Sequence, residues 1–198
     1  MTRIIGGDAG SLALKVPPQG TRPTSDRVRE AIFSALDSRD ALRGAHVADL
    51  YAGSGAQGLE AASRGAASVT LVDSSPRAGA VCRANASTVT RAAERSLHIE
   101  TVVSAVQPWL DRVTHGIRYS LVFLDPPYDL SEDHLAANLS SLVPHLDSDA
   151  TIVVERSSRS PEPSWPDAIT PLRSRRYGET VVWWAEAAGQ PAAPSHAV

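Results

Sequence analysis

DLYAGSGAQG, residues 49–58, is the stretch of sequence that decides the fold. It follows a short apolar run, His46–Leu50, and opens a helical pattern over residues 56–64. Glycines at this place let the backbone turn sharply and approach a ligand closely. A strand, a glycine-rich loop and a helix in this order predict one unit of a parallel α/β sheet, with a ligand site at the carboxyl edge of the strands.

The segments after this loop continue the alternation of strands and helices. Strands are predicted at Ser68–Asp73, Leu97–Val103, Tyr119–Asp125 and Ala150–Glu155, and helices at Ser75–Thr90, Ala105–Val113 and Glu132–Val143. Nearly continuous apolar strands separated by helices indicate a parallel sheet covered on both faces. Two more strand patterns, Ile169–Arg175 and Thr180–Ala185, follow each other with no helix between them. They predict an antiparallel hairpin that closes the sheet.

The segment before the loop has a different character. Arg3–Ile5 and Leu12–Val16 are short apolar runs around a glycine-rich turn, which predicts a β-hairpin. A helix follows, capped by Thr24 or Ser25. We therefore predict an N-terminal extension over residues 1–40, one α/β domain over residues 41–186, and a disordered tail over residues 187–198, which is rich in Ala and Pro.

The composition is that of an ordinary globular protein. The chain has 198 residues, 42% of them hydrophobic and 21% charged, and its net charge of −3 argues against a protein that coats nucleic acid without specificity. No apolar run approaches the roughly 20 residues of a membrane-spanning helix, and the first residues hold no apolar signal-peptide core, so a cytoplasmic location is expected. With Cys82 as its only cysteine, the chain can form no internal disulfide, and its histidines show no metal-ligand spacing.

The charges are unevenly distributed along the chain. Arginines and lysines gather in residues 1–30 and again in residues 156–176, whereas residues 125–149 contain none. The two basic segments could form one patch in the folded protein, as in a nucleic-acid footprint. The alternative is a scattered, solvated surface.

The glycine loop and Asp73 together predict a nucleoside-ligand site. Asp73 ends the next strand, where a carboxylate can accept the hydroxyl hydrogens of a ribose. The spacing Gly53, Gly55, Gly58 also satisfies the dinucleotide pattern, so the loop alone does not separate NAD from S-adenosylmethionine. Asp49 favours the second ligand, because a carboxylate there suits a cationic amine or sulfonium and would repel a pyrophosphate.

The sharper signal is Asp125-Pro126-Pro127-Tyr128, directly after a buried-strand pattern. Two consecutive prolines make a stiff corner whose carbonyls and carboxylate are fixed acceptors. The exocyclic amino group of a base is a poor nucleophile, and two acceptors that hold its hydrogens can aim its lone pair at a methyl carbon. Tyr128 would offer a face for the base, worth about 1–3 kcal/mol, and alignment of the two reactants supplies most of the remaining advantage.

These motifs resemble those of the bacterial RsmD-type methyltransferases, which form 2-methylguanosine in small-subunit ribosomal RNA. The resemblance extends from about Arg3 to Trp184 and rests on four blocks: residues 3–7, residues 22–33, residues 49–55 and residues 125–128. It implies a class I S-adenosylmethionine-dependent methyltransferase fold, which is Rossmann-like with a seven-stranded, mostly parallel sheet. It also implies that the substrate is a guanine of 16S rRNA, presented in the small ribosomal subunit or an assembly intermediate.

The resemblance also assigns residues to roles. Asp125, Pro126, Pro127 and Tyr128 would hold the guanine amino group. The methyl-donor site would contain Asp49, Tyr51, Ala52, Gly53, Ser54, Gly55, Asp73, Ser74, Ser104 and Ala105, and the residues near the RNA would be Arg3, Lys15, Arg22, Thr24, Arg27 and Arg29. The chain departs from the pattern at Ser104, where many relatives have an aspartate for the adenine, and at Ser74, where a basic residue is common.

Three other interpretations remain open from the sequence. The corner motif also permits an amino methyltransferase that acts on adenine or cytosine in DNA, although a separate DNA-recognition domain is hard to find in 198 residues. The glycine spacing alone permits a nicotinamide-dependent dehydrogenase. The chain could also be an RNA assembly factor that binds the donor without turnover, which intact Asp125 and Tyr128 argue against.

Overall fold

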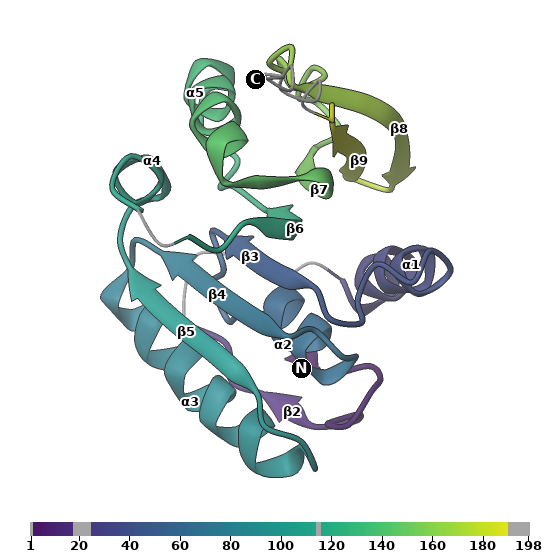
Figure 1. Ribbon diagram of the computed structural model, residues 1–198, viewed down its shortest axis with the longest axis vertical. Helices are drawn as coiled ribbons and strands as arrows, with labels where there is room; N and C mark the ends of the chain where they lie inside the picture. Colours follow the sequence, from purple (N-terminus) through teal and green to yellow (C-terminus); the bar gives the residue numbers. More distant parts are fainter. Residues whose placement is uncertain (1, 18–24, 114–115, 190–198) are drawn as a thin grey trace, which may run out of the picture.

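A seven-stranded sheet with the order β5-β4-β3-β6-β7-β9-β8 runs through the protein (Figure 1). The computed structural model describes residues 2–17, 25–113 and 116–189. Within them the sheet strands are β3 (His46–Leu50), β4 (Ser68–Asp73), β5 (His98–Val103), β6 (Tyr119–Leu124), β7 (Leu146–Ser157), β8 (Ile169–Tyr177) and β9 (Thr180–Ala187). The helices are α1 (Asp26–Asp37), α2 (Ala56–Ser63), α3 (Pro76–Ala92), α4 (Val106–Leu110) and α5 (Glu132–Leu142), with a 3₁₀ turn, η1, at Val143–His145.

The strand directions confirm the predicted mixed sheet. Strand β3 pairs in parallel with both β4 and β6, and β4–β5 and β6–β7 are parallel as well. Strand β9 is antiparallel to β7 and β8, so the C-terminal hairpin closes the sheet. From β3 the chain passes first to β4 on one side and later to β6 on the other, and this switch point is where α/β sheets bind ligands.

Both faces of the sheet are covered by apolar cores. Successive side chains along a strand point to opposite faces, and so they enter the two cores in turn. Val47 on β3 belongs to a core with Phe33 of α1, Leu59 of α2 and Val89 of α3. The other core includes Ala48 of the same strand together with residues of α4 and α5, among them Trp109, Leu135 and Leu139. Figure 1 shows α1, α2 and α3 on one side of the sheet and α4 and α5 on the other.

Local sequence explains where the helices begin. Ser25 caps α1, as predicted, by accepting a hydrogen bond from the backbone N–H of Val28. Ser75 caps α3 in the same way, and Pro76 stands at the start of that helix, where its missing N–H costs nothing. Ser131 caps α5. Helices α3 and α5 follow strands β4 and β6, so their capped starts lie just beyond the carboxyl ends of these strands.

The N-terminal extension is attached to α2. Its strands β1 (Thr2–Arg3) and β2 (Ala13–Leu14) form a two-residue antiparallel ladder, shorter than the predicted hairpin. The fully buried carboxylate of Glu60 accepts hydrogen bonds from the backbone N–H groups of Ile5, at 2.6 Å, and Gly6, at 2.9 Å. Ile4 and Leu14 share the core of α1 and α2, so the extension packs as part of the same body; its boundary at residue 40 stays a prediction.

The ends of several elements differ from the sequence patterns, most of them by one or two residues. Strand β7 begins at Leu146 instead of Ala150, α4 ends at Leu110 instead of Val113, and β9 continues through Ala187, the first residue of the predicted tail. Residues 190–198, most of that tail, lie outside the described residues. No helix among the described residues has the length and apolarity to span a membrane.

Candidate active site

The two motifs singled out in the sequence meet at the carboxyl edge of the sheet. Strands β3 and β6 are neighbours with Leu50 opposite Leu124, so each motif leaves the sheet at the same level. The backbone N–H of Asp125 donates to the carbonyl of Leu50 at 3.4 Å. Residues 49–55 and 125–128 therefore follow neighbouring strands at the same edge of the sheet, at the switch point where a ligand is expected.

The glycine loop has a backbone shape that depends on residue type. Tyr51, Gly53 and Gly55 have φ angles of 65°, 57° and 77°, in the left-handed region that favours glycine. Its amides are already used: the N–H of Gly53 donates to a carboxylate oxygen of Asp73 at 2.9 Å, and that of Gly55 donates to the carbonyl of Ala52 at 2.7 Å. The conformation of the loop is thus fixed by its contact with Asp73 of β4 and needs no ligand.

Helix α3 supports the same loop from beneath. The buried side chain of Asn85 donates to the carbonyl of Ser54 and to that of Lys15, both at 2.9 Å, and accepts from the N–H of Lys15. The buried thiol of Cys82 lies 3.3 Å from the carbonyl of Gly53. Asn85 was not predicted as a site residue, because nothing in its local sequence indicates that it joins two distant segments.

The side chain of Asp49 is directed into the protein, toward the start of α2. Its side chain is 2% exposed and accepts a hydrogen bond from the N–H of Gly58 at 2.8 Å. Burial raises the pKa of Asp49 to about 8; the charges of Asp125 and Asp73 add to the rise, and the hydrogen bond from Gly58 opposes it. Gly58 allows this contact, since a Cβ there would lie 2.5 Å from Leu71 Cδ2. A direct contact of Asp49 with a cationic ligand stays a prediction.

The other predicted donor-site residues gather at the ends of β4 and β5. Asp73, at the end of β4, accepts from the backbone N–H of Ser75 at 2.8 Å through one oxygen and holds Gly53 with the other. The N–H of Ser104 donates to the carbonyl of Asp73 at 3.0 Å, which brings the end of β5 alongside. Ser74 and Ala105 are exposed at the same edge.

Tyr51 is turned toward α5. Its hydroxyl donates to the side-chain oxygen of Asn138, and Asn138 in turn donates to Gln107 at 2.7 Å. Burial raises the pKa of Tyr51 to about 12. These hydrogen bonds connect the turn after β3 to α5 and α4, so Tyr51 helps to fix the position of the glycine loop relative to these helices. Asn138 and Gln107 were not predicted from the sequence.

The Asp-Pro-Pro-Tyr corner is exposed at its tip and anchored at its base. Pro126 is buried, whereas Asp125 and Tyr128 are exposed, the tyrosine by 65%. The guanidinium of Arg156, itself 4% exposed, donates to the carbonyls of Leu130, at 2.9 Å, and Pro127, at 3.4 Å, and pairs with Glu132. Arg156 is therefore a support of the corner. Although Arg156 belongs to the basic segment of residues 156–176, its guanidinium is buried and adds little to a charged surface.

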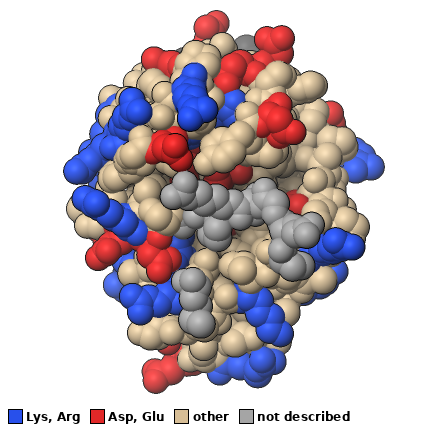
Figure 2. Space-filling model, turned by 180° about the vertical axis from the view of Figure 1, so that it is seen from behind, with Lys and Arg blue, Asp and Glu red and all other residues tan. Residues whose placement is uncertain are grey.

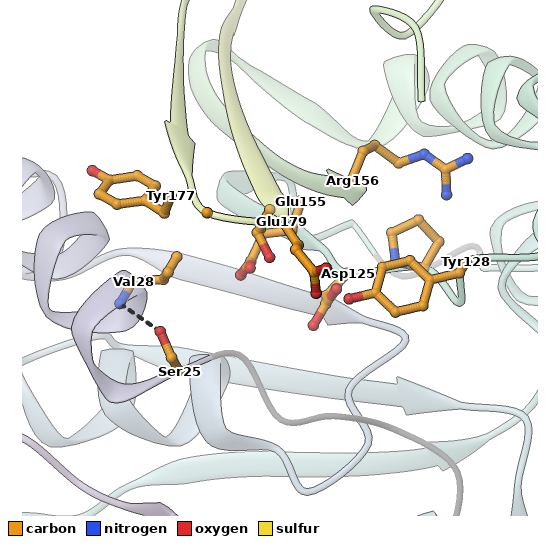
Figure 3. Close-up of a pocket in the computed structure, with 11 residues that line it drawn as sticks. Ser25, Val28, Asp125, Tyr128, Glu155, Arg156, Tyr177 and Glu179 are labelled. Atoms are coloured by element: carbon orange, nitrogen blue, oxygen red, sulfur yellow. Dashed lines mark hydrogen bonds between the residues drawn. The ribbon is translucent and has the colours of Figure 1, made fainter. Parts of the chain in front are cut away.

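A cavity of about 270 Å³ opens between this corner, the N-terminus of α1 and the β8–β9 turn. Figure 3 shows Tyr128 and Tyr177 on opposite sides of it, with Val28 of α1 and the cap residue Ser25 below Tyr177. The cavity has the size and the aromatic walls that suit one planar base. It joins residues 25–28 to residues 177–180, and no local pattern in the sequence predicts that contact.

The predicted RNA-contact residues have different positions. Arg3, Lys15 and Arg27 are exposed, and Arg22 and Thr24 lie outside the described residues. Arg29 is fully buried, and its guanidinium donates to the carbonyl of Arg3 at 2.6 Å and pairs with Asp26 at 2.7 Å. These contacts hold α1 against β1, and a position of Arg29 near the substrate entrance stays a prediction.

The charged surface is also more mixed than one patch. On the face opposite to the view of Figure 1, Asp and Glu side chains lie along the upper rim of the central hollow, and Lys and Arg side chains gather mostly at the sides and lower end (Figure 2). Within the part of the chain that the structure describes, no three His, Cys, Asp or Glu side chains are grouped to hold a metal ion.

Comparison with known proteins places the chain in a family. The family model described as Conserved hypothetical protein 95 matches residues 2–186. The chain is 31% identical to ribosomal RNA small subunit methyltransferase D of Escherichia coli K12, across 95% of this chain and 92% of that protein. The solved structure of E. coli yhhF, named as a candidate methyltransferase, superposes with a TM-score of 0.79 at 32% identity and covers 95% of this chain and 98% of its own.

A more distant structure bears on the fold alone. The magnesium protoporphyrin IX methyltransferase of Synechocystis PCC 6803, solved with bound S-adenosylmethionine, is 14% identical and has a TM-score of 0.63, over 85% of this chain and 86% of its own. The seven-stranded sheet of this chain is therefore the class I S-adenosylmethionine-dependent methyltransferase fold that the motifs predicted. The chain belongs to the Conserved hypothetical protein 95 family, the family of the RsmD-type methyltransferases.

Proposed function

We propose that this protein transfers a methyl group from S-adenosylmethionine to the exocyclic 2-amino group of a guanine in 16S ribosomal RNA. The observation that carries the proposal is the meeting of the glycine loop and the Asp-Pro-Pro-Tyr corner at one edge of the sheet, joined by the contact of Asp125 N–H with Leu50. A donor held by one motif and a base held by the other would lie within reach of each other there.

The glycine-loop side fits a nucleoside donor better than a dinucleotide. A pyrophosphate needs backbone N–H groups at the helix N-terminus, and here the amides of Gly53, Gly55 and Gly58 already donate to Asp73, Ala52 and Asp49. Asp73 keeps lone pairs for the hydroxyls of a ribose. S-Adenosylmethionine would supply a methyl carbon made electrophilic by the sulfonium to which it is attached.

The corner side would orient the acceptor nitrogen. The Asp125 carboxylate and a carbonyl of the Pro126-Pro127 segment are acceptors for the two amino hydrogens, and Tyr128 offers an exposed ring on which the base can stack. The nitrogen becomes acidic only after it gains the methyl group, so Asp125, or water beyond it, would take the proton after transfer. Arg156 keeps these groups in position through Pro127 and Leu130.

The RNA would approach across the N-terminal extension and the C-terminal hairpin. Arg3, Lys15 and Arg27 are exposed on the first, and Arg173, Arg175 and Arg176 on the second. The base must be single-stranded or flipped out, because the amino edge of a paired guanine is not accessible. The substrate would be rRNA within the small subunit or its assembly intermediate, and a cytoplasmic location follows from that substrate.

The proposal is tested by methylation of small-subunit rRNA from cells that lack the protein. With labelled S-adenosylmethionine the wild-type protein should label the 16S rRNA, and nucleoside analysis should give 2-methylguanosine. Asp125→Ala should lose almost all of this activity while still binding S-adenosylhomocysteine. Methyladenine or methylcytosine as the product, or full activity of Asp125→Ala, would overturn the proposal.

A further inference from the structure

Glu155 lies beside Asp125 on the neighbouring strand. Strands β6 and β7 pair in parallel with Leu124 opposite Val154, so the next residue of each strand, Asp125 and Glu155, falls at the same level and on the same face. Neighbouring strands are about 4.8 Å apart. The two carboxylates therefore form a pair at the carboxyl edge, with a spacing that suits two adjacent donors of one flat ligand.

The side chain of Glu155 is held in place from inside the protein. It is 4% exposed, and its Oε1 accepts a hydrogen bond from Nε2 of Gln57 on α2 at 2.5 Å, where Gln57 is itself 6% exposed. Despite this burial Glu155 lines the cavity between Tyr128 and Tyr177. Figure 3 shows the carboxylates of Asp125, Glu155 and Glu179 pointing toward one another, whereas the Arg156 guanidinium points away.

We infer that Glu155 is the residue that selects guanine, by accepting the N1–H of the base while Asp125 holds the 2-amino group. This inference rests on the proposed function and deepens it. On its Watson–Crick edge guanine presents N1–H next to the amino group, and an ionised carboxylate offers only acceptors. Asp125 and Glu155 would then read two neighbouring donors, with the ring between Tyr128 and Tyr177.

The same pair of carboxylates disfavours the other bases that carry an amino group. Adenine and cytosine have an unprotonated ring nitrogen beside the amino group, and its lone pair would face the Glu155 oxygen. A buried acceptor without a donor is costly, and a site built to bind a hydrogen rejects an analogue that lacks it. Glu155 would thus make the site specific for guanine, whereas the Asp-Pro-Pro-Tyr corner alone also permits adenine or cytosine.

The test uses a base that keeps the reacting 2-amino group but lacks the N1 hydrogen, together with the neighbouring 6-oxo group. The substrate is small-subunit rRNA with either guanine or 2-aminopurine at the methylated position. The wild-type protein should prefer guanine in kcat/KM by roughly 10- to 100-fold. In Glu155→Gln the amide keeps an acceptor for Gln57 and gains a donor for the ring nitrogen, so the preference should shrink by a similar factor or reverse.

Two variants serve as controls. Glu94→Gln removes an exposed carboxylate remote from the cavity, and Glu179→Gln removes the third carboxylate of the cavity; both should keep the wild-type preference. A shift of preference in Glu179→Gln instead of Glu155→Gln would overturn the assignment. Should Glu155→Gln fail to fold, the wild-type comparison can still refute the inference, because equal use of the two bases excludes a carboxylate reader. A wild-type protein that methylates no guanine refutes the proposed function instead.

Discussion

At the scale of single residues, the buried carboxylate of Asp49 makes stability depend on pH. Its pKa is about 8 in the folded protein, against an ordinary 3.8, chiefly because of burial. Between these values the folded state retains a proton that the unfolded chain has released. The free energy of unfolding should therefore fall as the pH rises from about 4 to about 8.

Asp49→Asn should flatten this dependence. The amide oxygen can still accept from the N–H of Gly58, and it takes no proton, so the difference in unfolding free energy between pH 5 and pH 8 should shrink. Urea denaturation at the two pH values measures it. Asp149→Asn, an exposed carboxylate outside the site, is the matched control and should behave as wild type. An unchanged slope in Asp49→Asn would refute this account.

Residues that act through their own short motif could be predicted from the sequence, and residues that act through distant partners could not. Gly53, Gly55 and the corner of residues 125–128 are recognisable because their backbone shape depends on local residue types. Arg156, Asn85 and Glu155 contribute through partners 24 to 98 positions away. Their local sequence is that of an ordinary strand or helix, so only the folded chain assigns them.

At the scale of elements, Arg156 on β7 sets the position of the corner after β6. Its planar guanidinium reaches Pro127, Leu130 and Glu132 at once. Arg156→Lys keeps the charge but loses the fork, so kcat/KM for rRNA should fall by roughly 10- to 100-fold through misplacement of the base.

The donor side of the site should be unaffected by this change. Affinity for S-adenosylhomocysteine should stay near wild type in Arg156→Lys, as measured by calorimetric titration, because the glycine loop is held by β4 and α3. A parallel loss of donor affinity would mean that Arg156 supports the whole edge of the sheet. An unchanged kcat/KM would mean that the Asp-Pro-Pro-Tyr corner keeps its position without the guanidinium of Arg156.

The arginines of the edge strand β8 are expected to contact phosphates of the RNA. Arg173 and Arg175 are exposed, and their guanidinium groups lie 5.0 and 5.2 Å from the ring centres of Trp184 and Tyr177. Tyr177 also lines the cavity, so phosphates next to the bound base would pass these arginines. The double variant Arg173→Gln, Arg175→Gln should bind rRNA more weakly, and its salt slope should be smaller by about 0.7 for each phosphate that it no longer neutralises.

The matched control is the double variant Arg39→Gln, Arg43→Gln. It removes two exposed arginines at the opposite, amino edge of the sheet and should leave both the affinity and the salt slope unchanged. Filter binding at several salt concentrations measures both quantities. Equal effects of the two double variants would indicate general electrostatic attraction and not a track on β8.

Sequence patterns predicted the existence of the elements better than their limits. Strand β7 begins four residues before the apolar run that predicted it, since Leu146 pairs with Tyr119 ahead of an irregular step in the ladder. Helix α4 ends early, at Leu110, although the helical pattern continues to Val113. The start of β7 depends on pairing with β6, which periodicity within one segment does not contain.

At the scale of the whole molecule, the extension, the glycine loop and α3 are joined through one side chain. Asn85 is 2% exposed and makes three hydrogen bonds at 2.9 Å, two to the backbone of Lys15 and one to the carbonyl of Ser54. The alternating pattern could predict the sheet and its carboxyl edge, but not this bond between the N-terminal extension and the donor site, because the two are separate in sequence.

Asn85→Ala should therefore weaken both folding and donor binding. Three partly buried backbone groups lose their partner, so the free energy of unfolding should fall by about 1–3 kcal/mol, and a loosened Ser54 should weaken the affinity for S-adenosylhomocysteine. Urea denaturation and calorimetric titration measure the two effects, with Thr90→Ala on the exposed face of α3 as control. A variant that loses stability but binds the donor as wild type does would show that the extension is attached to α3 without shaping the donor site.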